Sequence, residues 1–342
     1  MKRFTLAASA TSTLALGALG CSGFQSVLDP HGPKAEAISH LNSFLVTTAT
    51  IVFVLVICAL VFALRSSMTR EVAHDERDAE EPERNRSMAR WVTVAAAVTA
   101  VIMLVFVFVS VSTGSAIARV GGLRPLRIDV TGHQWWWEVE YPDNAVPQNI
   151  VTTANEIHVP VGRPVLIKMT SDDVIHSFWA PNLDGKKDLI PGHETRTWFR
   201  ADTAGVYRGQ CAEFCGYQHA KMAFFIVAEP RVEFEHWLTS QQSQASKPTD
   251  SLAQAGERVF LSGTCAMCHS IAGTGAGSKL GPDLTHLASR RTIAAGSLPN
   301  NTGNLAGWIL DPQSIKPGAK MPPNQLDPQS LQALLAYLGT LK

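Results

Sequence analysis

The stretch that decides the fold is GQCAEFCGYQHAKM, which runs from Gly209 to Met222. It is followed by the apolar run AFFIVA, which is typical of a β-strand. Thiolate and thioether sulfurs are soft ligands that favour copper. A loop of this kind before the last strand, joined by one distant His, is the arrangement of blue-copper sites. His176, in the earlier segment SDDVIHSFWAP, is the candidate for the distant ligand.

This loop holds one Cys more than a single copper ion needs. Two thiolates can bridge two ions, which leaves one His and one weak ligand for each ion. The predicted ligands of a dinuclear copper site are His176, Cys211, the backbone carbonyl of Glu213, Cys215, His219 and Met222. Two alternatives remain open, a Cys211–Cys215 disulfide and a zinc site, although a thioether is not a usual zinc ligand. Sharing one electron between two bridged ions is expected to lower the reorganisation energy of electron transfer.

The residues around this loop predict an all-β domain. Short strand-like runs separated by turn signals, such as LRIDVTG, WWWEVEY, PVLIKMTS and TRTWFRA, extend over residues 123–238. Their spacing indicates a sandwich or barrel, with no helix expected before Val232. Three consecutive Trp on one strand would alternate between its two faces, so Trp135 and Trp137 share a face and Trp136 takes the other.

The first third of the chain is predicted to be a membrane anchor. Residues 1–21 have the charged start and apolar stretch of a signal peptide, and lipidation of Cys21 is the alternative to simple cleavage nearby. Two uncharged runs, about 41–64 and 91–116, predict a transmembrane hairpin over residues 35–117. Six Arg lie between them, which places this loop in the cytoplasm and everything after the second helix outside. Cys58 in the first run is expected to be a small buried hydrophobe.

A second outer domain follows a polar linker at residues 239–250 and is predicted to be helical over residues 251–342. Ser251 is the expected cap of its first helix, and a last helix is expected from Asp327 to Leu341. Cys265-Ala-Met-Cys268-His269 is the covalent attachment signature of c-type haem, with His269 as an axial ligand. The expected second axial ligand is Met321, with His286 as the alternative, because His/Met ligation raises the reduction potential.

Three segments, GHQWWWEVEY, SDDVIHSFWAPNLDGKKDLIPG and YRGQCAEFCGYQHAKM, resemble subunit II of the haem–copper cytochrome c oxidases. The resemblance covers roughly residues 35–237. Residues 252–342 resemble a class I cytochrome c domain, and a subunit II with such a C-terminal fusion is the caa3-type arrangement. The implied fold is a membrane-anchored, multidomain one: a transmembrane hairpin, a cupredoxin-like β-sandwich and an all-α cytochrome c domain.

The resemblance also implies functional roles. The six predicted ligands match the dinuclear copper centre, called CuA, and the Glu213 side chain would reach a magnesium ion shared with subunit I. Trp135 would be the point at which electrons enter the copper site. Met88 and Ala95 stand where many family members have Glu and Pro, which leaves open whether this subunit contributes to proton uptake.

The implied function is electron delivery in the plasma membrane of a bacterium. A cytochrome c donor would reduce haem c, and the electron would pass through copper to subunit I, where oxygen is reduced and protons are pumped. The implied partners are oxidase subunits I and III, the donor and the lipid bilayer. A formal net charge of zero gives no indication of a nucleic-acid partner. The alternatives are an electron-transfer subunit of a nitric or nitrous oxide reductase and a membrane-anchored copper-binding protein.

Overall fold

The structure is a computed structural model that describes residues 23, 25–69, 77–119, 124–142 and 150–342. The expected signal peptide, Cys21 and Arg70 lie outside these residues. The chain divides into two compact units, one made of residues 36–119 and the other of the remaining described residues.

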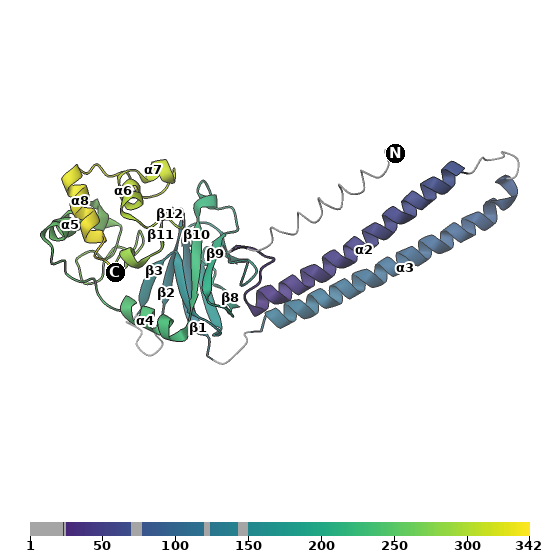
Figure 1. Cartoon of the computed structure of the whole chain (residues 1–342), viewed down its shortest axis with the longest axis horizontal. Helices are drawn as coiled ribbons and strands as arrows, with labels where there is room; N and C mark the ends of the chain where they lie inside the picture. The colour runs from purple at the N-terminus through teal and green to yellow at the C-terminus, as the bar shows by residue number, and fades with distance from the viewer. Residues whose placement is uncertain (1–22, 24, 70–76, 120–123, 143–149) are drawn as a thin grey trace, which may run out of the picture. The chain divides into compact units, whose positions relative to one another are not determined.

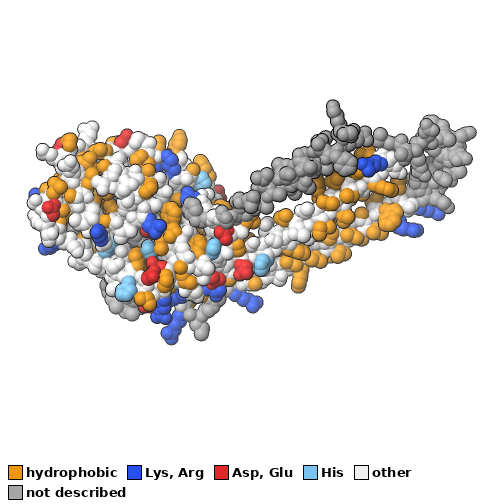
Figure 2. Space-filling model, in the orientation of Figure 1, with side chains coloured by type: hydrophobic (Ala, Val, Ile, Leu, Met, Phe, Trp, Pro, Cys, Tyr) orange, Lys and Arg blue, Asp and Glu red, His pale blue; other side chains and the backbone are white. Residues whose placement is uncertain are grey.

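The first unit is a pair of long helices, α2 (Pro33–Thr69) and α3 (Arg77–Ile117). Each contains an 18-residue window of mean hydropathy 2.8, and none of either window is buried inside the protein. A helix needs about 20 apolar residues to cross a bilayer, so both helices are long enough. Figure 2 shows hydrophobic side chains along their visible face. Bare apolar surface of this extent is explained by lipid contact rather than by burial in a soluble core.

The second unit begins with a β-sandwich of two five-stranded sheets (Figure 1). The first sheet has the strand order β3-β2-β1-β5-β8 and the second has the order β4-β10-β9-β6-β7. Their bounds are β1 (Leu126–His133), β2 (Trp136–Tyr141), β3 (Val151–Ala154), β4 (Glu156–Pro160), β5 (Val165–Ser171), β6 (His176–Trp179), β7 (Lys187–Leu189), β8 (Thr195–Phe199), β9 (Gly205–Cys211) and β10 (Ala223–Glu229). Burial alternates along β1, β2, β5 and β9, because successive side chains point to opposite faces.

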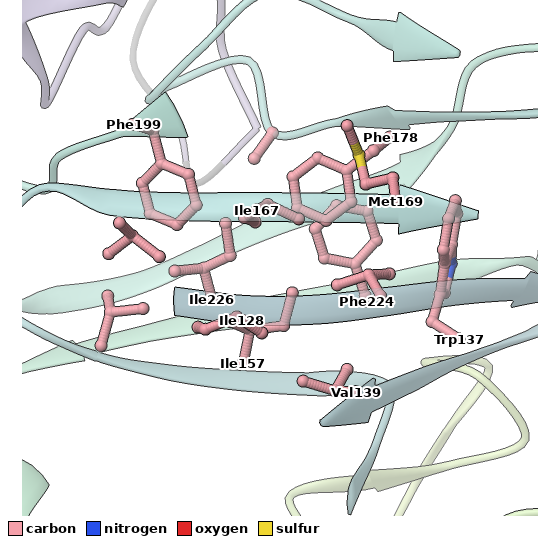
Figure 3. Packing of buried hydrophobic residues seen from close by; sticks show 14 of the residues in the cluster. Ile128, Trp137, Val139, Ile157, Ile167, Met169, Phe178, Phe199, Phe224 and Ile226 are labelled. Atoms are coloured by element: carbon pink, nitrogen blue, oxygen red, sulfur yellow. The ribbon is translucent and has the colours of Figure 1, made fainter. Parts of the chain in front are cut away.

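An aromatic cluster fills one end of the sandwich core (Figure 3). Trp137 from β2 packs its edge against Phe178 and Phe224, which stack on each other at 4.3 Å between ring centroids. Gly209 on β9 makes room for this cluster, since a Cβ built there would lie 2.1 Å from the Phe224 ring. The cluster supports the ends of β6, β9 and β10, which carry the predicted copper ligands.

A short helix, α4 (Arg231–Gln241), follows the sandwich. Its Trp237 stacks on His158 of β4 with 4.0 Å between ring centroids. The polar segment after α4 packs on the C-terminal domain, where the Ala245 amide donates to the Ala272 carbonyl and the Ser243 carbonyl contacts the His286 ring.

The C-terminal domain is built from α5 (Ser251–Ser262), α6 (Thr302–Leu310), α7 (Pro312–Ile315) and α8 (Pro328–Leu338), with short 3-10 turns and a β11–β12 hairpin (Thr292–Ile293 and Leu298–Pro299). The α5 cap is Asp250, whose carboxylate accepts from the amides of Leu252 and Ala253; the expectation of Ser251 was wrong by one residue. Asp327 caps α8 in the same way. The described residues therefore have the architecture that the sequence predicts: two apolar helices, a two-sheet β-sandwich and a helical C-terminal domain.

Candidate metal centre

The six predicted copper ligands converge because the start of β6, the end of β9 and the start of β10 lie at the same edge of one sheet. His176 begins β6, Cys211 ends β9, and Met222 lies directly before β10. A backbone hydrogen bond of 2.9 Å from the Cys211 amide to the Met222 carbonyl closes the intervening loop. The loop is therefore anchored at both ends on one antiparallel strand pair, which is a rigid support for ligands.

The ligand atoms lie within a few ångströms of one another. The sulfurs of Cys211 and Cys215 are 3.7 Å apart. The His176 Nδ1 atom is 3.8 Å from the Cys211 sulfur, and the His219 Nδ1 atom is 3.6 Å from that of Cys215. The weaker ligands complete the set: the Met222 sulfur is 3.8 Å from the Cys215 sulfur, and the Glu213 carbonyl oxygen is 3.2 Å from the Cys211 sulfur.

The distance between the two cysteine sulfurs excludes a disulfide in this structure. A disulfide has a sulfur–sulfur distance of about 2.0 Å, so the two thiols at 3.7 Å are free. The hydrogen bond between them lowers the pKa of Cys211 to about 4 and raises that of Cys215. Two thiolates, two imidazoles, a thioether and a carbonyl form a soft donor set that fits copper.

His176 is fixed from both sides. Its side chain is fully buried, and its Nε2 atom lies 2.9 Å from the Asp173 carboxylate, which leaves Nδ1 facing the thiols. Burial lowers the pKa of His176, but hydrogen bonds with Cys211 and Asp173 outweigh it and raise that pKa overall. Gly132 packs on the other side of the ring, where a Cβ would lie 2.8 Å from the His176 Cδ2 atom. A histidine ligand held by a carboxylate in this way has one defined tautomer and orientation.

Trp135 lies in the turn between β1 and β2 rather than on the strand, and it is only 9% exposed. Its indole Nε1–H donates to the Cys215 carbonyl at 2.9 Å. The C-terminal domain covers it: a Cβ built at Gly318 would lie 3.7 Å from its ring, and Lys316 donates to its carbonyl at 2.8 Å. Trp137 is buried and Trp136 is half-buried, so the Trp of this run do not all belong to the core.

The predicted haem-attachment residues of the C-terminal domain lie together in and after a 3-10 turn, Thr264–Met267. The His269 Nδ1 atom lies 2.8 Å from the Pro282 carbonyl and donates to it, which leaves Nε2 as the unprotonated nitrogen of the ring. Burial lowers the pKa of His269, which favours the neutral form that binds iron. Gly281 forms a cradle for the ring, since a Cβ there would lie 2.8 Å from the His269 Cε1 atom.

The two candidates for the second iron ligand differ. His286 is buried, and both of its ring nitrogens have partners, the carbonyls of Lys342 and Ser243, so it serves the structure. Met321 lies in a loop held by the Gln313 amide, which donates to the carbonyls of Ala319 and Met321 at 2.8 Å. The contacts of His286 therefore argue against it, and Met321 remains the predicted ligand.

The sequence did not reveal several neighbours of these residues. Asp173 and Gly132 lie against the His176 ring. Lys316 donates to the Trp135 carbonyl, and Lys320 donates to the Asp173 carboxylate. Only Asp173 left a signal, an acidic residue three positions before His176.

The fold and the site define a class, a membrane-anchored cupredoxin-like protein joined to a cytochrome c domain. Residues 126–229 match the family described as cytochrome c oxidase subunit II, periplasmic domain, and residues 253–342 match cytochrome c. Cytochrome c oxidase subunit 2 of Alkalihalophilus pseudofirmus is 35% identical over 97% of this chain and 95% of its own length. The chain belongs to the cytochrome c oxidase subunit II family and is a subunit of a haem–copper terminal oxidase.

Two further likenesses accompany this one. Cytochrome c oxidase subunit 2 of Bacillus sp. (strain PS3) is 36% identical over 63% of this chain and 62% of its own length. A crystal structure of the periplasmic domain of oxidase subunit II from Bradyrhizobium japonicum is 34% identical, covers 36% of this chain and 97% of that one, and has a TM-score of 0.34. The two domain types together imply copper and haem, a membrane anchor and an extracellular domain.

Proposed function

We propose that this subunit carries electrons from a cytochrome c donor, through covalent haem c, to a dinuclear CuA centre and on to subunit I. There oxygen would be reduced to water with proton pumping. The observation that carries the proposal is the convergence of two free thiols, two imidazoles and a thioether within one loop and one neighbouring strand, with contacts of 3.6–3.8 Å. When bound, the copper pair and the haem supply one-electron redox chemistry.

The protein residues would act by holding these groups rigidly. The copper ligands would be His176, Cys211, Glu213 through its carbonyl, Cys215, His219 and Met222. Cys211 and Cys215 would hold the copper pair as thiolates. Because the loop is closed by backbone hydrogen bonds and its core side is packed with aromatic rings, the ligands would move little when the charge changes.

The cytochrome domain would hold haem c through Cys265 and Cys268, and His269 and Met321 would be the side chains that bind its iron. The close approach of Gly281 to the His269 ring and the contact of Nδ1 with the Pro282 carbonyl, which leaves Nε2 as the acceptor, support this assignment. The Gln313 amide would keep the Met321 loop in place.

Trp135 would connect the two sites. Its indole N–H reaches the carbonyl of the copper ligand Cys215, and Gly318 of the cytochrome domain lies against its ring. A donor cytochrome has no free access to a residue that is 9% exposed, so electrons would enter through the cytochrome domain.

The copper loop has an exposed surface that is suited to a partner protein. The Glu213 side chain is exposed beside Phe214 and Tyr217, which are 76% and 90% exposed. Such a patch suits a partner surface, and we propose that it faces subunit I with Glu213 at a shared magnesium ion. Subunit III would belong to the same complex. The chain would lie in a bacterial plasma membrane with its arginine-rich loop in the cytoplasm and its termini and both metal domains outside.

Electron paramagnetic resonance of the purified, copper-loaded oxidase tests the copper assignment. A symmetric two-copper centre gives a seven-line mixed-valence pattern, and we expect it in the wild type. Cys215→Ser should abolish this pattern and leave haem absorbance intact, because the bridge is lost while the cytochrome domain is unaffected. Cys58→Ser, in the apolar helix α2, is the matched control and should keep the pattern. A four-line pattern in the wild type would contradict the proposal.

A further inference from the structure

The carboxylate of Asp173 lies between the copper loop and the cytochrome domain. It follows β5, and its side chain is only 16% exposed. One oxygen lies 2.9 Å from the His176 Nε2 atom. The other accepts from the Gln134 amide at 2.7 Å and from the Lys320 ammonium at 3.2 Å. A single side chain thus contacts a predicted copper ligand, the residue before Trp135 and the cytochrome domain.

Lys320 directly precedes Met321, the predicted iron ligand. Its side chain is 66% exposed, and an isolated ion pair of this kind would contribute little. It does not act alone, because the same loop is seated on the copper loop by further contacts. The side-chain amide of Gln218 donates to the Pro317 carbonyl at 2.7 Å, and the Lys221 ammonium donates to the Ile315 carbonyl. These contacts hold the Lys320 ammonium close to Asp173.

We propose that Asp173 is a positioning residue that couples the copper site to docking of the haem-ligand loop. It orients His176 through one oxygen and receives Lys320 through the other when the cytochrome domain is docked. The inference rests on the proposed copper and haem ligands. It adds that the contact between the two domains sets the electrostatics of the copper site.

The sign of each charge effect follows from this geometry. A carboxylate that accepts from a ligating His makes the ligand more basic and stabilises the oxidised metal. Loss of the Asp173 charge should therefore raise the copper reduction potential. Loss of the positive charge of Lys320 leaves the negative charge of Asp173 without its partner. This change should lower the copper reduction potential. Opposite shifts from two members of one ion pair are not expected of a purely structural role.

The test is a redox titration of the copper-loaded and haem-loaded oxidase, with copper followed by its paramagnetic resonance signal. We expect a higher copper potential in Asp173→Asn and a lower one in Lys320→Met. Copper loss to a chelator should be about tenfold greater in Asp173→Asn, as when other residues that orient a metal ligand are changed, and unchanged in Lys320→Met. Lys320→Arg should restore the wild-type potential, and high salt should shrink the Lys320→Met shift.

Lys279→Met is the matched control. Lys279 belongs to the same domain and pairs with Glu140 at 3.6 Å; among the described residues it contacts no predicted copper ligand, so the copper potential should stay unchanged. Equal potentials in the wild type, Asp173→Asn and Lys320→Met would overturn the inference alone. A wild-type oxidase without a two-copper signal would overturn the proposed function instead. Lys320 is a surface residue, so its variant remains informative even if Asp173→Asn folds poorly.

Discussion

At the residue scale, glycines determine how closely the backbone can approach the copper ligands. Gly132 on β1 leaves space for the His176 ring, and Gly216 in the copper loop has a positive φ of 107°. A residue with a side chain is strained at such a φ. The ligands supply the chemistry, but these glycines allow the backbone and the imidazole to approach each other. Ligand geometry therefore depends on residues that have no side chain of their own.

Gly132→Ala should weaken copper binding. Its Cβ would lie 2.8 Å from the His176 Cδ2 atom, so the ring must shift. We expect about a tenfold lower copper affinity and about 1–3 kcal/mol lower stability. Chelator competition and thermal unfolding measure the two effects. Gly205→Ala is the control, because its Cβ would lie at an ordinary 3.6 Å from Tyr207; equal copper affinity in the two variants would contradict this prediction.

At the element scale, the cytochrome domain is held together by the packing of α5 on α8. Phe260 of α5 and Tyr337 of α8 lie 6.1 Å apart between ring centroids in the core of this domain. Gly256 allows the close approach, since a Cβ there would lie 1.9 Å from the Ala333 carbonyl oxygen. The helix pair precedes and follows the haem-binding segments, so its spacing affects how they are presented.

Gly256→Ala should separate α5 from α8 and lower the stability of the cytochrome domain by about 3 kcal/mol. Gly307→Ala is the matched control on α6, where nothing lies within 4 Å of the new Cβ. It should be neutral or stabilise by up to about 1 kcal/mol, because Ala favours helix. Thermal unfolding followed by haem absorbance distinguishes them. The prediction is wrong if both variants unfold at the wild-type temperature.

At the scale of the whole molecule, docking of the cytochrome domain buries a lysine. Lys316 is 3% exposed, and its ammonium donates to the carbonyls of Trp135 at 2.8 Å and Ala294 at 3.3 Å. Burial, together with the nearby charge of Lys221, lowers the pKa of Lys316 from 10.5 to about 7. The docked state therefore binds this proton less tightly than the undocked state does.

Docking should strengthen as the pH rises. The undocked Lys316 keeps its proton up to about pH 10.5, whereas the docked one releases it near pH 7. Between these values the docking equilibrium should improve by up to about tenfold per pH unit. The haem-to-copper electron-transfer rate of the full oxidase measures the docked fraction. Lys316→Met should flatten the pH dependence, and the exposed-lysine variant Lys279→Met should keep it; equal slopes in all three proteins would count against the prediction.

Much of the candidate site was predictable because its information is local. Four of the six copper ligands are side chains within twelve residues, and their order in one loop indicated two ions and soft ligands. The haem signature is similarly short. Long apolar runs predicted the two membrane helices, although both helices extend beyond those runs. The predicted cap of α5, Ser251, is one residue away from the observed cap, Asp250. Both residue types are good caps, and the two are adjacent in the chain.

Residue types at short spacing were enough to identify the class of each domain and to predict the kind of metal and its ligands. Only the tertiary structure decided that Trp135 is covered, that Lys316 is buried and that Asp173 meets both His176 and Lys320. The contacts from Lys316 to Trp135 and from Lys320 to Asp173 join residues 181 and 147 positions apart. No local pattern specifies such pairs, because they form only where two separately folded domains bury a common surface.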